Sequence, residues 1–282
     1  MINCDLTENY KLKICNLWYS VIMLILFYLF ILGLFLGSFF NVLSDRLPQE
    51  QSILGRSHCD FCKKNLTVLD LIPVYSFLSL KGRCRYCHKK LSYFYPLVEI
   101  LTGCLFVIAW ITTPIVIPTA VNLLAARIIT IGLFSVLLTI FMADVKYHLI
   151  PDSLQFVFLV LALCYHLVQA ASWLMLGSFI VSGILVMLPI LILYLITRGR
   201  GMGFGDVKLA FVIGFLLGTI PGWIALYIGF IAGSVVGVAL LITKKKKLKS
   251  QIAFGPFLII GIVLSVFYQT EIIRVWQSFF IY

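Results

Sequence analysis

Long runs of apolar residues, separated by short polar segments, dominate this chain of 282 residues. A helix needs about 20 mostly apolar residues to cross a bilayer, because its backbone polar groups must be hydrogen-bonded within the segment. We expect such helices at roughly 17–43, 97–118, 123–143, 153–172, 174–197, 206–219, 222–243 and 252–270, the sixth being short. The pattern predicts an all-α polytopic membrane protein with about eight transmembrane helices.

The composition supports this fold class. Apolar residues make up 62% of the chain, charged residues 12%, and the mean hydropathy is +1.07. Soluble domains carry about 25% charged residues, so a soluble protein is excluded. The first apolar run is too long for the core of a signal peptide, and we expect it to be retained as a membrane helix.

The distribution of positive charge predicts the orientation, because short cytosolic loops of membrane proteins collect Lys and Arg. With the N-terminus outside, 18 of the 22 Lys and Arg residues fall on the inner side. We therefore expect both termini outside a bacterial inner membrane, with residues 1–16 as a short external segment. The net charge of +11 follows from this topology and does not indicate nucleic-acid binding. The run Lys244–Lys247 is interpreted as a cytosolic flank, with binding of anionic lipid as the alternative.

The one long polar segment, about 45–95, contains two Cys-x-x-Cys pairs, Cys59 with Cys62 and Cys84 with Cys87. Two such pairs complete a tetrahedral four-thiolate zinc site of the closed, structural kind. Two disulfides are the alternative, but the charge pattern puts this segment in the cytosol, where disulfides seldom persist. We therefore expect a cytosolic four-cysteine zinc loop between the first two membrane helices.

Three acidic residues lie near the inner ends of apolar runs: Glu99, Asp144 and Asp206. Ionisable groups at such positions are costly and often functional. A structural interpretation is also available, in which Asp206 caps a helix after a glycine turn and Asp144 is an interfacial charge. The functional interpretation is that Asp144 and Asp206 reach one membrane depth from two helices and form a two-carboxylate site.

Several segments together resemble the type IV prepilin peptidases in order and content, over roughly residues 33–260. They are Gly37-Ser-Phe-Phe-Asn41-Val, Asp45-Arg46-Leu-Pro48, the two cysteine pairs, Tyr95-Pro-Leu-Val-Glu99, the Asp144 segment through Ile150-Pro-Asp152, and Gly201-Met-Gly-Phe-Gly-Asp206-Val-Lys-Leu. The Gly-x-Gly-Asp element is also found in presenilin-like proteases and preflagellin peptidases. Its combination with the cysteine loop is what makes the resemblance specific.

The resemblance implies a bifunctional enzyme that removes the basic leader of prepilin-like proteins and methylates the new N-terminus with S-adenosylmethionine. It implies that Asp144 and Asp206 are the catalytic pair at the cytosolic face. It also links residues 17–95, extending to about 100, to methyl transfer, and residues 96–282 to the peptidase. The candidate residues for binding the methyl donor are Gly37, Asn41, Arg46 and Glu99.

Two other functions remain open at this point. The chain could be a membrane protease of the preflagellin or presenilin-like type, although those relatives lack a cysteine insert. It could instead be a non-enzymatic transporter or scaffold, in which the three acids line an ion path and the zinc loop binds a partner. The transporter or scaffold predicts no proteolysis of any pilin-like peptide, and the other protease type would act on other membrane segments.

Overall fold

The computed structural model describes residues 9–59, 61–113, 120–169, 172–243 and 253–268, together with 271, 274 and 278. Its helices are α1 (Asn9–Arg46), η1 (Leu47–Gln49), η2 (Val68–Leu71), α2 (Tyr75–Ser79), α3 (Phe94–Thr112), α4 (Ala120–Tyr147), α5 (Asp152–Val168), α6 (Trp173–Thr197), α7 (Phe204–Leu217), α8 (Thr219–Ile242) and α9 (Gly255–Phe267). Within the described ranges, extended pairing is limited to isolated bridges in the cysteine loop. The predicted all-α class is confirmed.

Each of the eight predicted apolar runs coincides with a long helix, α1 or one of α3 to α9. Among the residues that the structure describes, five helical segments are long and apolar enough to cross a membrane: Tyr19–Gln49, Phe94–Thr112, Asn122–Tyr147, Trp173–Thr197 and Thr219–Ile242. Helices α5, α7 and α9 have 17, 14 and 13 residues. At 1.5 Å per residue they reach about 20–25 Å, less than the roughly 30 Å of a bilayer core. Eight full crossings therefore stay a prediction.

The chain divides into two compact units, and the first comprises Met1–Asn41 and Gly55–Ile111. Its helices α1 and α3 pack backbone against backbone at glycines. A Cβ atom on Gly33 would lie 2.7 Å from Gly103 Cα, and one on Gly37 would lie 2.8 Å from Glu99 Cα. Such close approach through small residues is typical of helix pairs in membranes, where packing replaces the hydrophobic effect between helices.

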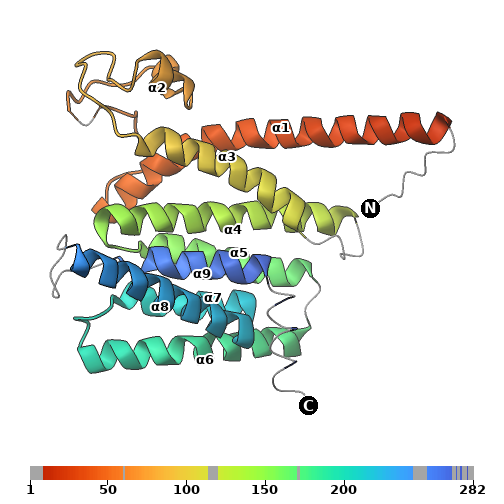
Figure 1. Ribbon diagram of the computed structural model, residues 1–282, viewed down its shortest axis with the longest axis vertical. Helices are drawn as coiled ribbons and strands as arrows, with labels where there is room; N and C mark the ends of the chain where they lie inside the picture. The colour runs from red at the N-terminus through yellow and green to blue at the C-terminus, as the bar shows by residue number, and fades with distance from the viewer. Residues whose placement is uncertain are drawn as a thin grey trace. The chain divides into compact units, whose positions relative to one another are not determined.

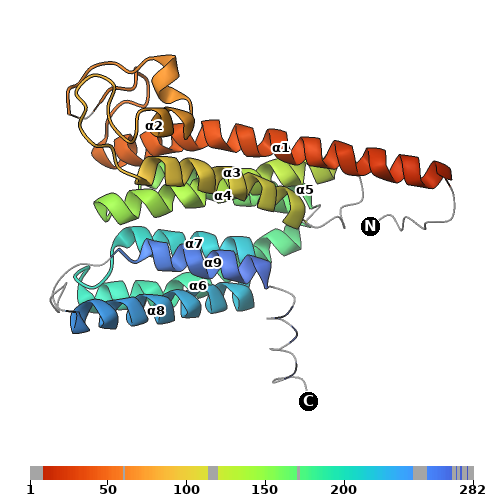
Figure 2. The ribbon, with the colours of Figure 1, turned by 45° about the horizontal axis from the view of Figure 1, so that its top comes forward.

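The second unit comprises Val42–Leu54 and Thr112–Tyr282, and its helices α4 to α9 run roughly along one direction (Figure 1). Helix α7 is the inner helix, packed against α5, α6, α8 and α9 (Figure 2). A Cβ atom on Gly214 of α7 would lie 2.6 Å from the Ser182 carbonyl oxygen of α6. Close packing of this kind fixes α7, and with it the residue Asp206 in its first turn.

Two predicted features lie outside the described residues. They are the lysine run from Lys244 to Lys247, with Lys249, and the first eight residues of the expected external N-terminus. The interpretation of the lysine run therefore stays a prediction.

Candidate active site and metal centre

The four cysteines of the polar loop come together as the spacing predicted. Their sulfur atoms all lie within 4.8 Å of one another, and the Cys59 and Cys87 sulfurs are 3.9 Å apart. All four are free thiols, so no disulfide joins them. Four sulfurs bound about 2.3 Å from one tetrahedral zinc ion lie about 3.8 Å apart. The arrangement therefore fits a four-thiolate metal site.

The two cysteine pairs sit in turns of the same design. In the first, the Lys63 N–H donates to the Cys59 carbonyl at 2.8 Å, and in the second the His88 N–H donates to the Cys84 carbonyl at 3.0 Å. Lys63 and His88 both have a φ of 55°. Matching turns of this kind converge two sulfurs each, which is what a four-coordinate site requires.

Backbone N–H groups also favour the thiolate form of one ligand. Burial raises the pKa of the Cys84 thiol, but hydrogen bonds from the backbone of Cys87 and Tyr86 outweigh it and lower the pKa to about 7. The thiolate is the form that binds metal.

Three basic residues of the loop contact aromatic rings or an acidic side chain of the same loop. Lys64 lies over the Tyr86 ring, and Lys89 lies over the Phe61 ring. Arg85 forms an ion pair of 2.6 Å with Asp70. Burial opposes ionisation of Asp70, but hydrogen bonds from Thr67 and Arg85, with the charge of Arg85, lower the pKa of its carboxyl below the usual value. The second cysteine turn is thereby tied to η2.

In the second unit, Asp144 and Asp206 come from different helices and are both buried. Asp144 lies in the last turn of α4 and is 5% exposed, while Asp206 lies in the first turn of α7 and is 7% exposed. The two carboxylates are close enough to repel each other when both are charged. The structure thus brings the two side chains toward each other, and their role as a catalytic pair stays a prediction.

Each carboxylate accepts a hydrogen bond from a glycine N–H. Asp144 Oδ2 accepts from Gly255 at 2.8 Å, and Asp206 Oδ2 accepts from Gly203 at 3.1 Å. Gly255 is the first residue of α9, so the positive end of that helix dipole faces Asp144. Gly203, not Asp206, is the N-cap of α7, and the Asp206 side chain closes the helix start from the third helical position by accepting the Gly203 N–H.

The segment after Asp144 packs against the first turns of α7 and α9. A Cβ atom on Gly205 or on Gly255 would lie 3.3 Å from side-chain atoms of Ile150. The Gln155 side chain donates to the Gly205 carbonyl at 3.2 Å. A larger side chain at either glycine would press on Ile150, and at Gly255 also on the Asp144 carboxylate, so glycine suits both positions.

Sequence reasoning did not single out Gly255 or Gln155. Gly255 is far from Asp144 along the chain, and the only signal for it is the Gly255-Pro256 pair at the start of an apolar run. Pro at the first positions of a helix marks a helix start, where N–H groups are free to bind a carboxylate. Gln155 carries no signal beyond being a polar residue within an apolar helix.

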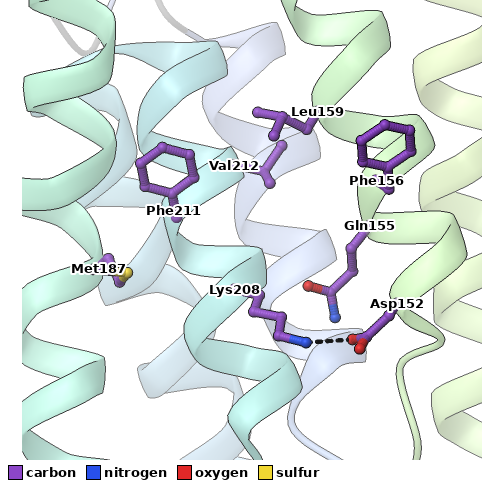
Figure 3. A pocket seen from close by; sticks show the side chains of 8 residues that line it. All are labelled: Asp152, Gln155, Phe156, Leu159, Met187, Lys208, Phe211 and Val212. Atoms are coloured by element: carbon purple, nitrogen blue, oxygen red, sulfur yellow. Dashed lines mark hydrogen bonds and ion pairs between the residues drawn. The ribbon is translucent and has the colours of Figure 1, made fainter.

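A groove of about 330 Å³ opens between α5, α6 and α7 (Figure 3). Apolar side chains line most of it, and at one end Lys208 forms a 2.7 Å ion pair with Asp152. At 3.6 residues per turn, Lys208 lies about 200° around α7 from Asp206. The groove is therefore on the opposite face of α7 from the Asp206 side chain.

Three of the four residues expected to bind the methyl donor come together in the first unit. Gly37 packs on α3, the Asn41 side chain donates to the Tyr95 carbonyl at 3.2 Å, and Glu99 accepts from the Val74 N–H at 2.7 Å. These three lie where α1 meets α3 in the first unit. Arg46 belongs to the second unit, where its guanidinium donates to the carbonyls of residues 52 and 53.

Two family models match the chain. The Bacterial Peptidase A24 N-terminal domain matches residues 31–113, and the Type IV leader peptidase family matches residues 131–242. A Prepilin leader peptidase/N-methyltransferase of Bacillus subtilis (strain 168) is 34% identical over 249 residues, which cover 87% of this chain and 95% of the relative. The protein of the same name from Aeromonas salmonicida (strain A449) is 30% identical over 280 residues, covering 88% and 92%.

No solved structure matches the chain significantly. The sequence relatives, in contrast, align over nearly their whole length, and the matched segments contain both the cysteine loop and the two buried aspartates. Together with the five long apolar helices, they make this a multi-pass membrane protein. The chain belongs to the type IV leader peptidase family.

Proposed function

We propose that this protein is a membrane aspartic endopeptidase that removes the basic leader of prepilin-like proteins and methylates the new N-terminus with S-adenosylmethionine. The observation that carries the peptidase assignment is the pair of buried carboxylates, Asp144 in the last turn of α4 and Asp206 in the first turn of α7. The relatives named Prepilin leader peptidase/N-methyltransferase support the choice of substrate and the second activity.

Two adjacent carboxylates supply both groups that peptide hydrolysis needs, because at close range they do not both ionise. The ionised one takes a proton from a water molecule, which attacks the scissile carbonyl carbon. The protonated one donates a hydrogen bond to the carbonyl oxygen, and the leaving amine is protonated as the C–N bond breaks. The N–H groups of Gly255 and Gly203 hold the two side chains in place, and no covalent enzyme intermediate forms.

The charge pattern supports cleavage at the cytosolic face of the inner membrane. The inner-side assignment of 18 of 22 Lys and Arg residues puts the cysteine loop and both aspartates on that side. A basic leader remains in the cytosol for the same reason, while the apolar segment of the substrate enters the bilayer. The scissile bond then lies at the depth of Asp144 and Asp206.

Methyl transfer is proposed for the first unit, with Gly37, Asn41 and Glu99 at its centre and Arg46 as a further candidate. Asn41 and Glu99 bring polar groups into the contact between α1 and α3, and a carboxylate suits the hydroxyl and ammonium groups of S-adenosylmethionine. When bound, that molecule supplies a methyl group from its sulfonium. Glu99 is oriented by hydrogen bonds from the Val74 N–H and the Ser38 hydroxyl.

We propose that the four cysteines hold a structural zinc ion, since the thiolate set and sulfur spacing suit zinc and leave no open coordination position. The metal stabilises the loop and takes no part in either reaction.

The first prediction concerns the aspartates. Asp144→Asn and Asp206→Asn should each lower leader cleavage by on the order of 100-fold or more, because an amide neither ionises nor donates an acidic proton. The measurement is co-expression with a candidate prepilin-like substrate, followed by mass spectrometry of the substrate N-terminus. Asp152→Asn is the matched control: this side chain is 72% exposed and should remain active. Efficient cleavage by either variant of the pair contradicts the mechanism.

The second prediction concerns the metal. The purified protein should contain one zinc ion per chain, and Cys59→Ser combined with Cys84→Ser should abolish binding, because each pair loses a ligand. Elemental analysis measures this, and Cys104→Ser, an exposed cysteine on α3, is the control. Loss of zinc should speed proteolysis of the 45–95 loop while the helices stay intact, since loop folding is linked to metal binding. Zinc retained by the double variant would refute the site.

The third prediction separates the two activities. With a substrate that is already cleaved, Glu99→Gln should reduce methylation several-fold, because it removes a buried charge from the first unit. Asp206→Asn should leave methylation of the same substrate largely intact. Transfer of a labelled methyl group to the N-terminus measures both. If Asp206→Asn abolishes that transfer, one shared pocket replaces the proposal of two sites.

A further inference from the structure

Charge is segregated along the loop that carries the cysteine pairs. Residues 65–80, between the two pairs, contain no Lys or Arg and a single acid, Asp70. The flanking stretches 56–64 and 81–90 contain eight Lys and Arg residues. The middle of the loop is therefore chemically distinct from the two metal-binding turns.

This middle segment folds into η2 and α2, which contact each other and direct large apolar side chains outward. The exposed fractions are 81% for Val68, 60% for Leu69, 64% for Tyr75 and 67% for Leu78, and Leu71 is also exposed. We call these five residues the η2–α2 face. Five exposed large apolar side chains on two short, contacting helices are unusual on a part of a protein that contacts water alone.

The segment that carries the η2–α2 face is attached near the N-terminal end of α3, a helix long enough to cross a membrane. Glu99 of α3 accepts the N–H of Val74, the residue before α2, at 2.7 Å. Glu99 is five residues beyond the first residue of α3, which places it about 7–8 Å along the helix at 1.5 Å per residue. Phe77 of α2 also packs edge-on against Tyr93, with ring centroids 5.3 Å apart.

Figures 1 and 2 agree with these contacts, since both draw α2 beside the first turns of α3. Helix α3 is long and apolar enough to cross a membrane from Phe94 onward. An element held beside its first turns therefore lies at the depth of the lipid headgroups, where apolar side chains and tyrosine rings are favoured.

The backbone at the attachment point is strained. Val74 has a φ of 59° and a ψ of −47°, and the Tyr75 N–H bonds back to the Pro73 carbonyl at 2.5 Å, which is a γ-turn. A β-branched residue with positive φ is a true outlier and persists only when its surroundings hold it there. The buried Glu99 carboxylate is the group that holds it.

We propose that the η2–α2 face is an interfacial membrane anchor, which lies in the headgroup region of the bilayer that the chain spans. The apolar side chains contact acyl chains, and the flanking Lys and Arg residues contact anionic headgroups. Glu99 positions the anchor through the Val74 turn. The anchor holds the metal-binding loop at the membrane surface, and this role does not depend on either enzymatic activity.

The test uses the full-length protein in vesicles of phosphatidylethanolamine and phosphatidylglycerol that contain a phospholipid with a photoreactive acyl chain. After illumination, mass spectrometry locates the lipid adducts along the chain. We expect adducts in residues 65–80 and in α3, and at least fivefold fewer in residues 56–64 and 81–90. Labelling of α3 without labelling of residues 65–80 overturns the proposal.

A variant makes the same test specific. Val68→Glu with Leu78→Glu should lower labelling of residues 65–80 at least fivefold with zinc content unchanged, because carboxylates leave the acyl region. Leu54→Glu, at an exposed apolar residue outside both the metal-binding turns and the η2–α2 face, is the matched control and should leave this labelling unchanged. Equal labelling of the double variant and the unmodified protein contradicts the anchor. If the double variant loses zinc, the proposal is judged by the labelling of residues 65–80 in the unmodified protein alone.

Discussion

Two carboxylates must be buried together in an apolar helix bundle, and the second unit is arranged around that constraint. A buried carboxylate is costly unless hydrogen bonds and dipoles replace water. Asp144 and Asp206 each accept a glycine N–H, one from the start of α9 and one from the turn before α7. A Cβ atom on Gly255 would lie 2.7 Å from the Asp144 carboxylate, so the contact requires glycine. Helix α7, packed on four neighbours, holds Asp206 at the same place.

The first unit is stabilised by other interactions than a pair of buried carboxylates. Its two helices meet through glycines, and four sulfur atoms organise the loop between them. The boundary between the units, at Ile111, falls close to the end of the first family match at residue 113. Each unit thus has its own stabilising device, which is the physical basis for expecting two separable activities from one chain.

The sequence predicted those features that depend on local pattern. Apolar runs located the long helices, and the spacing of Cys59, Cys62, Cys84 and Cys87 located the sulfur cluster. Hydrogen bonds donated by backbone N–H groups could not be predicted, because every residue except proline has such a group. The Val74 contact to Glu99 leaves no trace in the pattern. For the Gly255 contact to Asp144, across 111 positions, the pattern holds only the helix-start signal of Gly255 and Pro256. The hydropathy pattern also did not predict the lengths of all the helices. In the structure, α5, α7 and α9 are shorter than a bilayer crossing requires.

The central claim is that Asp144 and Asp206 act as one pair that shares a proton. The most direct measurement is kcat/KM for leader cleavage by the purified protein across a wide pH range, with a soluble prepilin-like peptide as substrate. A pair that needs one protonated and one ionised carboxylate predicts a profile that falls at both acidic and basic pH. A profile that stays flat across the range would contradict the claim.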